Sequence, residues 1–265
     1  MPSIVARAVV IFALILSAGC APHGPPKPQP VQDPWEGMNR KIFWFNDKAD
    51  TYFLAPVARG YEYITPKPVE NSIRNFFSNL RFPVHFVSEL IQFKFSDAAE
   101  QAGRFIVNTT IGVVGLFDPA TDMGLHGTQD DIGVAFGYHG VPEGPYLVLP
   151  FLGPSNVRDA IGRIGNLLLD PLFFASRIGE TSDGKDWVLT GLYALDIVDT
   201  RASLLEAVKT AKESSLDYYL FAQSAYHQYR QGLIYDGNAP DDEDGLEYSD
   251  EPTKEDKEEL PAGLP

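Results

Sequence analysis

The chain contains a single cysteine, Cys20, which stands directly behind a short apolar segment. Arg7 and the free amine give a positive start, and residues 8–16 form an apolar run too short to span a bilayer. The small residues Ala18 and Gly19 precede the cysteine, a pattern typical of a cleaved secretory signal. Because a lone thiol has no partner in the chain, we expect the fold to lack an internal disulfide.

Cys20 resembles the lipidated first residue of a bacterial lipoprotein, since it directly follows a small-residue cleavage site. Ser17 departs from that pattern, which usually has leucine there. Ala21 follows in place of aspartate, as in lipoproteins that are sorted onward to the outer membrane. We therefore predict a signal peptide over 1–19 and an acyl anchor on Cys20. The alternative is a plain secreted protein with an incidental cysteine.

Charge and length limit the possible functions. Removal of the signal leaves about 245 residues, enough for one sizeable domain or two small ones. The formal net charge is −15, and residues 236–265 hold twelve acidic residues against two lysines. This balance does not suit nucleic acid, which requires clustered Lys and Arg. No apolar run of eighteen residues follows Cys20, so we expect no conventional transmembrane helix.

Composition divides the mature chain into three regions. Residues 20–34 are rich in proline and are predicted to form an extended tether without core contacts. Residues 35–235 have the composition of a folded domain. Residues 236–265 are acidic and poor in large apolar side chains, so we expect a disordered tail.

The periodicity of the domain is mostly helical. Asp33, before Pro34, is a good N-terminal signal for a first helix whose apolar residues recur at three- and four-residue spacing. Asp97 with Glu100 resembles a capping box that opens another helix. Further helices are predicted over 156–169, 186–197, 202–212 and 216–232.

The strand signal is weaker. Residues 132–137 and 146–151, joined by a Gly/Pro loop, could form one hairpin. The predicted fold class is mainly α, a single helical domain with one short β-hairpin.

Three segments are unusually apolar for a soluble helical protein: 73–95, 112–117 and 147–152. The first carries six phenylalanines, which lie on several sides rather than in one stripe. These segments could form a buried core. They could instead contact lipid as interfacial helices or helical hairpins, because each is too short to cross a bilayer alone. The candidates for membrane contact are Phe45, Phe77 and Phe86.

No catalytic signature is present. The sequence lacks a Gly-x-Ser-x-Gly elbow, a His-Glu-x-x-His pair and a phosphate-binding glycine loop. His85 lies among apolar residues and is predicted to be a core histidine. A loose group of acids around a histidine lacks the spacing of metal ligands, so we expect no bound metal. That group is Asp122, His126, Asp130 and Asp131. Because the catalytic motifs are also missing, we expect no cofactor and no enzymatic activity.

The glycine-rich segment 137–146 has two interpretations. It could be a plain turn, or it could be a functional loop that moves and controls access to a binding site or passage. The gating candidates are Gly137, Gly140, Gly144 and Tyr146. Arg158 and Asp159 follow at a helix start and could form a functional ion pair. We expect separate local partners instead, because adjacent helix positions do not face each other. Asp159 would then support the helix dipole modestly.

Three blocks resemble the VacJ/MlaA lipoprotein family, in the family's order. They are DPWEGMNR at 33–40, RFIVNTTIG at 104–112 and GPYLVLPFLGPSNVRD at 144–159. The third is highly specific, and its Pro150, Arg158 and Asp159 are structural motif residues. The acidic tail is a departure, since nothing similar is matched in the family.

The resemblance implies an outer-membrane lipoprotein, facing the periplasm, that maintains lipid asymmetry. Such proteins are helical rings lying in the inner leaflet, with an amphipathic channel. They take phospholipids misplaced in the outer leaflet and pass them to a soluble periplasmic lipid carrier, while a trimeric porin holds the ring in the outer-membrane bilayer. No bond changes in this process, which agrees with the absence of a catalytic signature. A passive envelope scaffold, or less readily a lipid-modifying enzyme, is the alternative.

The anchor can be tested directly. We predict that Cys20→Ser leaves the precursor uncleaved or mislocalised, because acylation supplies the membrane affinity that cleavage of the signal removes. Fractionation of cell envelopes measures the outcome. Normal outer-membrane recovery of this variant without acyl chains would contradict the anchor.

Overall fold

In the computed structural model, residues 31–178 and 187–238 are described, and most of them are helical. A π-helical segment, Asp50–Leu54, joins the first two helices. The two strands are β1 (Tyr146–Leu149) and β2 (Gly153–Asn156). The helices are α2 (Glu36–Ala49), α3 (Ala55–Ile64), α4 (Lys67–Leu80), α5 (Phe82–Ile91), α6 (Phe95–Thr110), α7 (Pro119–Asp122), α8 (Ile132–Tyr138), α9 (Val157–Leu169), α10 (Pro171–Ile178), α11 (Trp187–Ser203), α12 (Leu205–Ser214) and α13 (Tyr218–Ile234).

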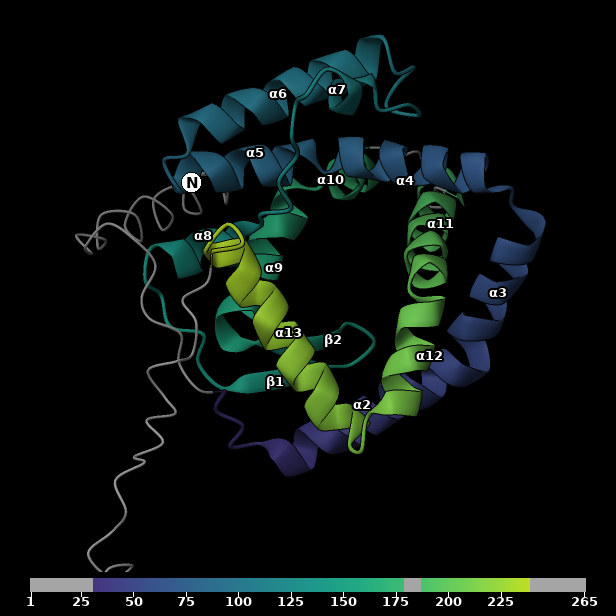
Figure 1. Cartoon of the computed structure of the whole chain (residues 1–265), viewed down its shortest axis with the longest axis vertical. Helices are drawn as coiled ribbons and strands as arrows, with labels where there is room; N and C mark the ends of the chain where they lie inside the picture. Colours follow the sequence, from purple (N-terminus) through teal and green to yellow (C-terminus); the bar gives the residue numbers. More distant parts are fainter. Residues whose placement is uncertain (1–30, 179–186, 239–265) are drawn as a thin grey trace, which may run out of the picture.

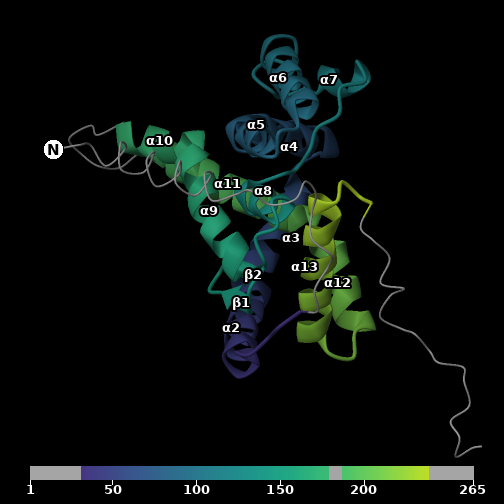
Figure 2. The ribbon, with the colours of Figure 1, turned by 90° about the vertical axis from the view of Figure 1, so that its left-hand side faces the viewer.

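The helices follow one another around a ring when the molecule is viewed face-on (Figure 1). From α2 at the bottom, the chain rises through α3 and crosses the top through α4 and α5. Helices α11 and α12 descend alongside α3, and α13 returns to α8. Figure 2 shows α6 stacked on α5, with α7 beside α6, at the end away from the hairpin. The prediction of a mainly helical, ring-like domain with one short hairpin is confirmed.

One strand was predicted in the wrong place. Residues 132–137 lie in helix α8, because Asp131 accepts a hydrogen bond from the backbone N–H of Val134 and caps the helix. The hairpin pairs β1 with β2 in antiparallel register, with Tyr146 opposite Asn156. A short apolar run does not distinguish a buried helix from a strand, and here the cap decides.

Two asparagines of α2 hold the outer edge of β1. The side chain of Asn39, which is fully buried, donates to the carbonyl of Tyr146 and accepts from the N–H of Val148. The side chain of Asn46, two turns further along α2, donates to the carbonyl of Leu149 and accepts from the N–H of Phe151, just after the strand. The two side-chain amides thus take the place of a third strand, because they pair backbone N–H and C=O groups that the edge of β1 would otherwise leave without hydrogen-bond partners.

The predicted helix starts are correct in part. Asn156 caps α9 through the N–H of Asp159, as the predicted start at 156 requires. Asp33 caps no helix, because α2 begins at Glu36 behind Trp35. The Asp33 carboxylate accepts instead from the side chains of Asn39 in α2 and Gln223 in α13. The capping box at Asp97 is also absent, since α6 already begins at Phe95.

The end of the predicted tether belongs to the fold. Val31 packs against the cluster around Tyr146, and the carbonyl of Gln32 accepts from the Tyr146 N–H at 2.8 Å. The prediction of no core contacts is therefore wrong for these residues. At the other end, Asp236 forms an ion pair with Lys94 at 2.6 Å. The signal peptide, Cys20 and most of the tether and acidic tail lie outside the described residues.

The three phenylalanines proposed for membrane contact occupy different environments. Phe45 is 44% exposed, whereas Phe86 is partly buried beside Phe82. Phe77 is only 3% exposed, so outward lipid contact is wrong for this residue. It lies seven residues, or two turns, from the buried Glu70 on the packed face of α4. None of the described helices is long and apolar enough to cross a membrane.

A pair of glycines lets α8 and α9 cross closely. A Cβ atom on Gly162 would stand 2.5 Å from the backbone nitrogen of Gly133. A Cβ on Gly133 would in turn meet the Asp159 carboxylate at 2.7 Å. The two helices therefore approach along their backbones, and this contact places the first turn of α9 against the start of α8.

We expect Gly162→Ala to destabilise the domain by about 1–3 kcal/mol, because the added methyl group forces the two backbones apart. Gly191→Ala is the matched control, since a Cβ at this position in α11 has nothing within 4 Å. That change should raise stability by up to about 1 kcal/mol through helix propensity. Denaturant unfolding followed by circular dichroism compares them, and equal stability of both variants would contradict the close crossing.

Candidate functional site

A cavity of about 630 Å³ lies within the ring, hereafter the central cavity. Its walls come from α4, α5, α9, α10 and α11, and Leu149 and Leu152 of the hairpin close one side. Apolar side chains such as Phe77, Val84 and Leu167 form much of the lining. Charged side chains stand among them, so the cavity is amphipathic. This combination suits a ligand with a polar and an apolar part.

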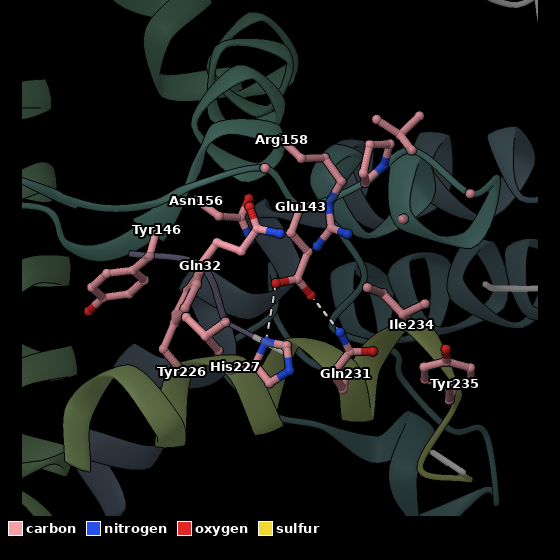
Figure 3. Close-up of a pocket in the computed structure, with 16 residues that line it drawn as sticks. Gln32, Glu143, Tyr146, Asn156, Arg158, Tyr226, His227, Gln231, Ile234 and Tyr235 are labelled. Atoms are coloured by element: carbon pink, nitrogen blue, oxygen red, sulfur yellow. Dashed lines mark hydrogen bonds and ion pairs between the residues drawn. The ribbon is translucent and has the colours of Figure 1, made fainter. Parts of the chain in front are cut away.

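A second cavity, the loop cavity, has a volume of about 490 Å³ and lies beside the glycine-rich segment (Figure 3). The structure brings all four gating candidates to its wall, namely Gly137, Gly140, Gly144 and Tyr146. Gly140 and Gly144 have φ values of +84° and +67°, so the loop depends on glycine at both positions. Gly137 is still helical and packs against Ile234 and Arg158.

Glu143 fastens this loop to α13. Its carboxylate lies 3.1 Å from Nδ1 of His227 and accepts a hydrogen bond from the Gln231 side chain at 2.5 Å (Figure 3). The backbone carbonyl of Glu143 also accepts from the N–H of Arg158 at 3.1 Å. The loop is thereby connected to α9 and α13 together, and a movement of either helix would displace it.

A buried ionic network joins α8, α9 and α13 beside the loop. Arg230 of α13 donates two hydrogen bonds to Asp131, at 2.9 and 3.0 Å, and its Nε lies 2.8 Å from Asp159. Asp159 also accepts from Tyr226 at 2.6 Å and from Arg158 at 2.9 Å. Arg158, Asp159 and Arg230 are almost fully buried.

The network corrects the expectation for Arg158 and Asp159. The two side chains contact each other although they are adjacent, because they lie in the first turn, where the Arg158 side chain can fold back onto its neighbour. Asp159 is 4% exposed rather than on the surface, so removal of its charge would cost more than the loss of an exposed helix-dipole contact.

The pKa values in this network reflect burial and pairing. Burial alone would raise the pKa of Asp131, but the hydrogen bonds from Arg230 lower it below the ordinary value. Burial would likewise lower the pKa of Arg230, whereas Asp131 and Asp159 raise it. Burial raises the pKa of Tyr226, and the neighbouring Asp159 adds to this effect. These groups are thus held in fixed charge states, which suits structural support rather than proton transfer.

The remaining candidates do not form a reaction centre. Pro150 lies in the exposed hairpin turn, beside Phe151, whose ring meets that of Phe45 edge-to-face at 5.2 Å. His85 is bonded to the carbonyl of Asp130, and burial lowers its pKa, as expected for a core histidine. Within 31–178 and 187–238, no group of three or more His, Cys, Asp or Glu side chains could hold a metal ion.

Sequence reasoning missed the residues that connect distant segments. Arg230 lies in a helix without a motif, 99 residues from Asp131, and nothing local marks it. Asn39 falls inside the first family block, where its role against β1 is not visible. Arg163, on the cavity face of α9, belongs to none of the three blocks.

We expect Asp159→Asn to destabilise the domain by about 3–5 kcal/mol, because two buried guanidinium groups would lose their shared carboxylate. Glu36→Gln is the control, since this glutamate is 52% exposed and pairs only along its own helix, where the effect should stay below about 1 kcal/mol. Thermal unfolding of the purified proteins provides the measurement. Equal melting of the two variants would show that the network adds little to stability.

The comparisons with known proteins agree with one another. The intermembrane phospholipid transport system lipoprotein MlaA of Shigella flexneri is 34% identical over 84% of this chain and 85% of its own length. An uncharacterised protein of Rickettsia bellii is 36% identical over 77% of each chain. A solved structure, described as the structural basis for maintenance of bacterial outer membrane lipid asymmetry, matches with a TM-score of 0.65 and 30% identity, covering 77% of this chain and 99% of that one. The family model for the MlaA lipoprotein matches residues 31–233, and the chain belongs to this family.

Proposed function

We propose that this protein removes phospholipids misplaced in the outer leaflet of the outer membrane by passing them through the central cavity. Membership of the MlaA lipoprotein family supports a role in intermembrane phospholipid transport. The observation that carries the route is the amphipathic central cavity, whose apolar walls can accommodate acyl chains while its charged side chains face a headgroup. The relatives that are named as phospholipid transport lipoproteins align with most of this chain, so we apply the proposal to the whole domain.

The outer surface supports placement of the ring in a lipid leaflet. Large apolar side chains are exposed on α2, on the π-helical segment Asp50–Leu54 and on α3. They include Trp44, Tyr52, Phe53, Val57, Tyr63 and Ile64. Burial of each such side chain in lipid is worth about 1.5–3 kcal/mol, so several together hold a domain without a spanning helix. Exposed apolar surface marks a membrane or protein interface where such side chains gather in one patch.

The resemblance assigns the partners of this transport. Cys20 carries the anchor in the outer-membrane bilayer, a trimeric porin holds the ring there, and a soluble periplasmic lipid carrier receives the phospholipid. The protein faces the periplasm so that this transfer can occur. The loop cavity beside Gly140 and Gly144 is the place where a change of loop conformation would open or close the route.

The transport proposed here needs no chemical step. A lipid-modifying enzyme would convert labelled phospholipid to new products, whereas the transporter returns it unchanged. A passive scaffold would leave the lipid composition of the outer leaflet unaffected by changes inside the cavity. These readouts separate the three functions.

Blocking the cavity tests the proposal. Ala160→Phe places a ring into the central cavity from α9. Ala194→Phe is the matched control, because this residue is exposed on α11 and lies outside the cavity lining. In a deletion strain complemented with each variant, outer-leaflet phospholipid is measured with a membrane-impermeant amine reagent.

We expect Ala160→Phe to accumulate outer-leaflet phospholipid as the deletion strain does, at normal protein abundance. Ala194→Phe should retain the asymmetry of the wild type. If a well-expressed Ala160→Phe variant keeps wild-type asymmetry, the central cavity is not the lipid route.

A further inference from the structure

Five charged side chains line the central cavity, and three of them have an opposite charge in contact. Arg81 donates to both carboxylate oxygens of Asp196 at 2.7 Å. Asp131 is held by two hydrogen bonds from Arg230, as part of the ionic network. These pairs are neutral overall and leave little charge for a ligand.

Arg163 is different. Its single hydrogen bond goes from Nη2 to the backbone carbonyl of Pro154 at 3.2 Å. Within 31–178 and 187–238, no carboxylate forms an ion pair with it, and its other N–H donors have no described partner. A guanidinium group presents these donors in a planar fork that matches phosphate oxygens.

Asp170 is the complementary case. One oxygen accepts from the N–H of Leu172 at 2.8 Å, and the other lies 3.4 Å from the hydroxyl of Tyr193. Among the described residues, no Lys, Arg or His forms an ion pair with this carboxylate. Asp170 lines the cavity as a carboxylate without a cationic partner among the side chains that the structure describes.

The two unpaired charges share one face of α9. Asp170 directly follows the helix and stands seven residues beyond Arg163, which is two helical turns and a rise of about 10 Å. Leu167, which lies between them, and Ala160, three residues before Arg163, also line the cavity. Because both side chains line the same cavity, a headgroup that carries a phosphate and an ammonium meets a cationic and an anionic partner there.

We infer that the central cavity selects phospholipids with a zwitterionic headgroup, with the phosphate on Arg163 and a primary ammonium on Asp170. This inference rests on the proposed transport function and adds a headgroup preference to it. A primary ammonium donates N–H hydrogen bonds to Asp170 and neutralises its charge. An anionic phospholipid with a hydroxyl-bearing headgroup has no cation for this carboxylate, whose charge then stays uncompensated near the lipid phosphate.

Binding competition tests this preference. Full-length protein in detergent is mixed with equimolar phosphatidylethanolamine and phosphatidylglycerol, and native mass spectrometry measures the ratio of the two bound lipids. Asp170→Asn removes the charge while keeping an N-cap for α10, because asparagine caps as well as aspartate does. Lys209→Gln is the control, since that lysine is exposed on α12 away from the cavity.

The wild type should prefer phosphatidylethanolamine by about tenfold, the effect of one charged hydrogen bond. Asp170→Asn should reduce the ratio to about one, and Lys209→Gln should leave it unchanged. Arg163→Gln should weaken binding of both lipids, because both carry the phosphate, and Arg163→Lys should restore part of it. Melting curves confirm that the variants are folded.

Two results would overturn the inference. If the wild type binds both lipids equally, or if Asp170→Asn keeps the wild-type ratio, the headgroup preference is wrong while phospholipid transport stands. If the wild type binds neither lipid, the proposed function itself fails and the inference fails with it.

Discussion

The contact of Arg230 with Asp131 and Asp159 is the interaction on which the ring depends. Helix α13 is the last described helix of the chain, and this guanidinium group joins it to the starts of α8 and α9. Because all three charges are largely withdrawn from water, each needs the others, and loss of one would leave its partners buried without compensation. The close crossing of Gly133 and Gly162 brings the carboxylates within reach. The ring is therefore closed by polar contacts among buried groups rather than by one large apolar core.

The same arrangement connects the two cavities. Helix α9 carries Asp159 of the network in its first turn and presents Arg163 and Leu167 to the central cavity. Glu143 ties the glycine-rich loop to α13, which the network also holds. Because the Glu143 carbonyl also accepts from the N–H of Arg158, the loop is connected to α9, which lines the central cavity that we propose as the lipid route. In our account, the rigid network positions the route, and the glycine positions with positive φ allow the loop to move against it.

Local sequence signals predicted local structure well. The periodicity gave the helical class, and Asn156 marked the start of α9 correctly. The error at 132–137 arose because a short apolar run fits a strand and a buried helix equally. Phe77 was wrongly assigned to lipid. Its burial depends on which face of α4 packs inward, and this is a tertiary property that the sequence does not reveal. Arg230 and Asn39 could not be found, since their partners lie about a hundred residues away in the sequence.

The candidate site was predicted in outline only. The family blocks indicated the glycine-rich loop, which does line a cavity. Arg163 and Asp170 carry no motif, and the lack of a described ion pair at either one is visible only in the structure. The most direct test of the account is a cryo-EM structure of the lipidated protein in a bilayer nanodisc containing phosphatidylethanolamine. The account predicts headgroup density inside the central cavity between Arg163 and Asp170, with acyl chains along its apolar wall. Lipid density confined to the outside of the ring, with the cavity closed by side chains, would contradict it.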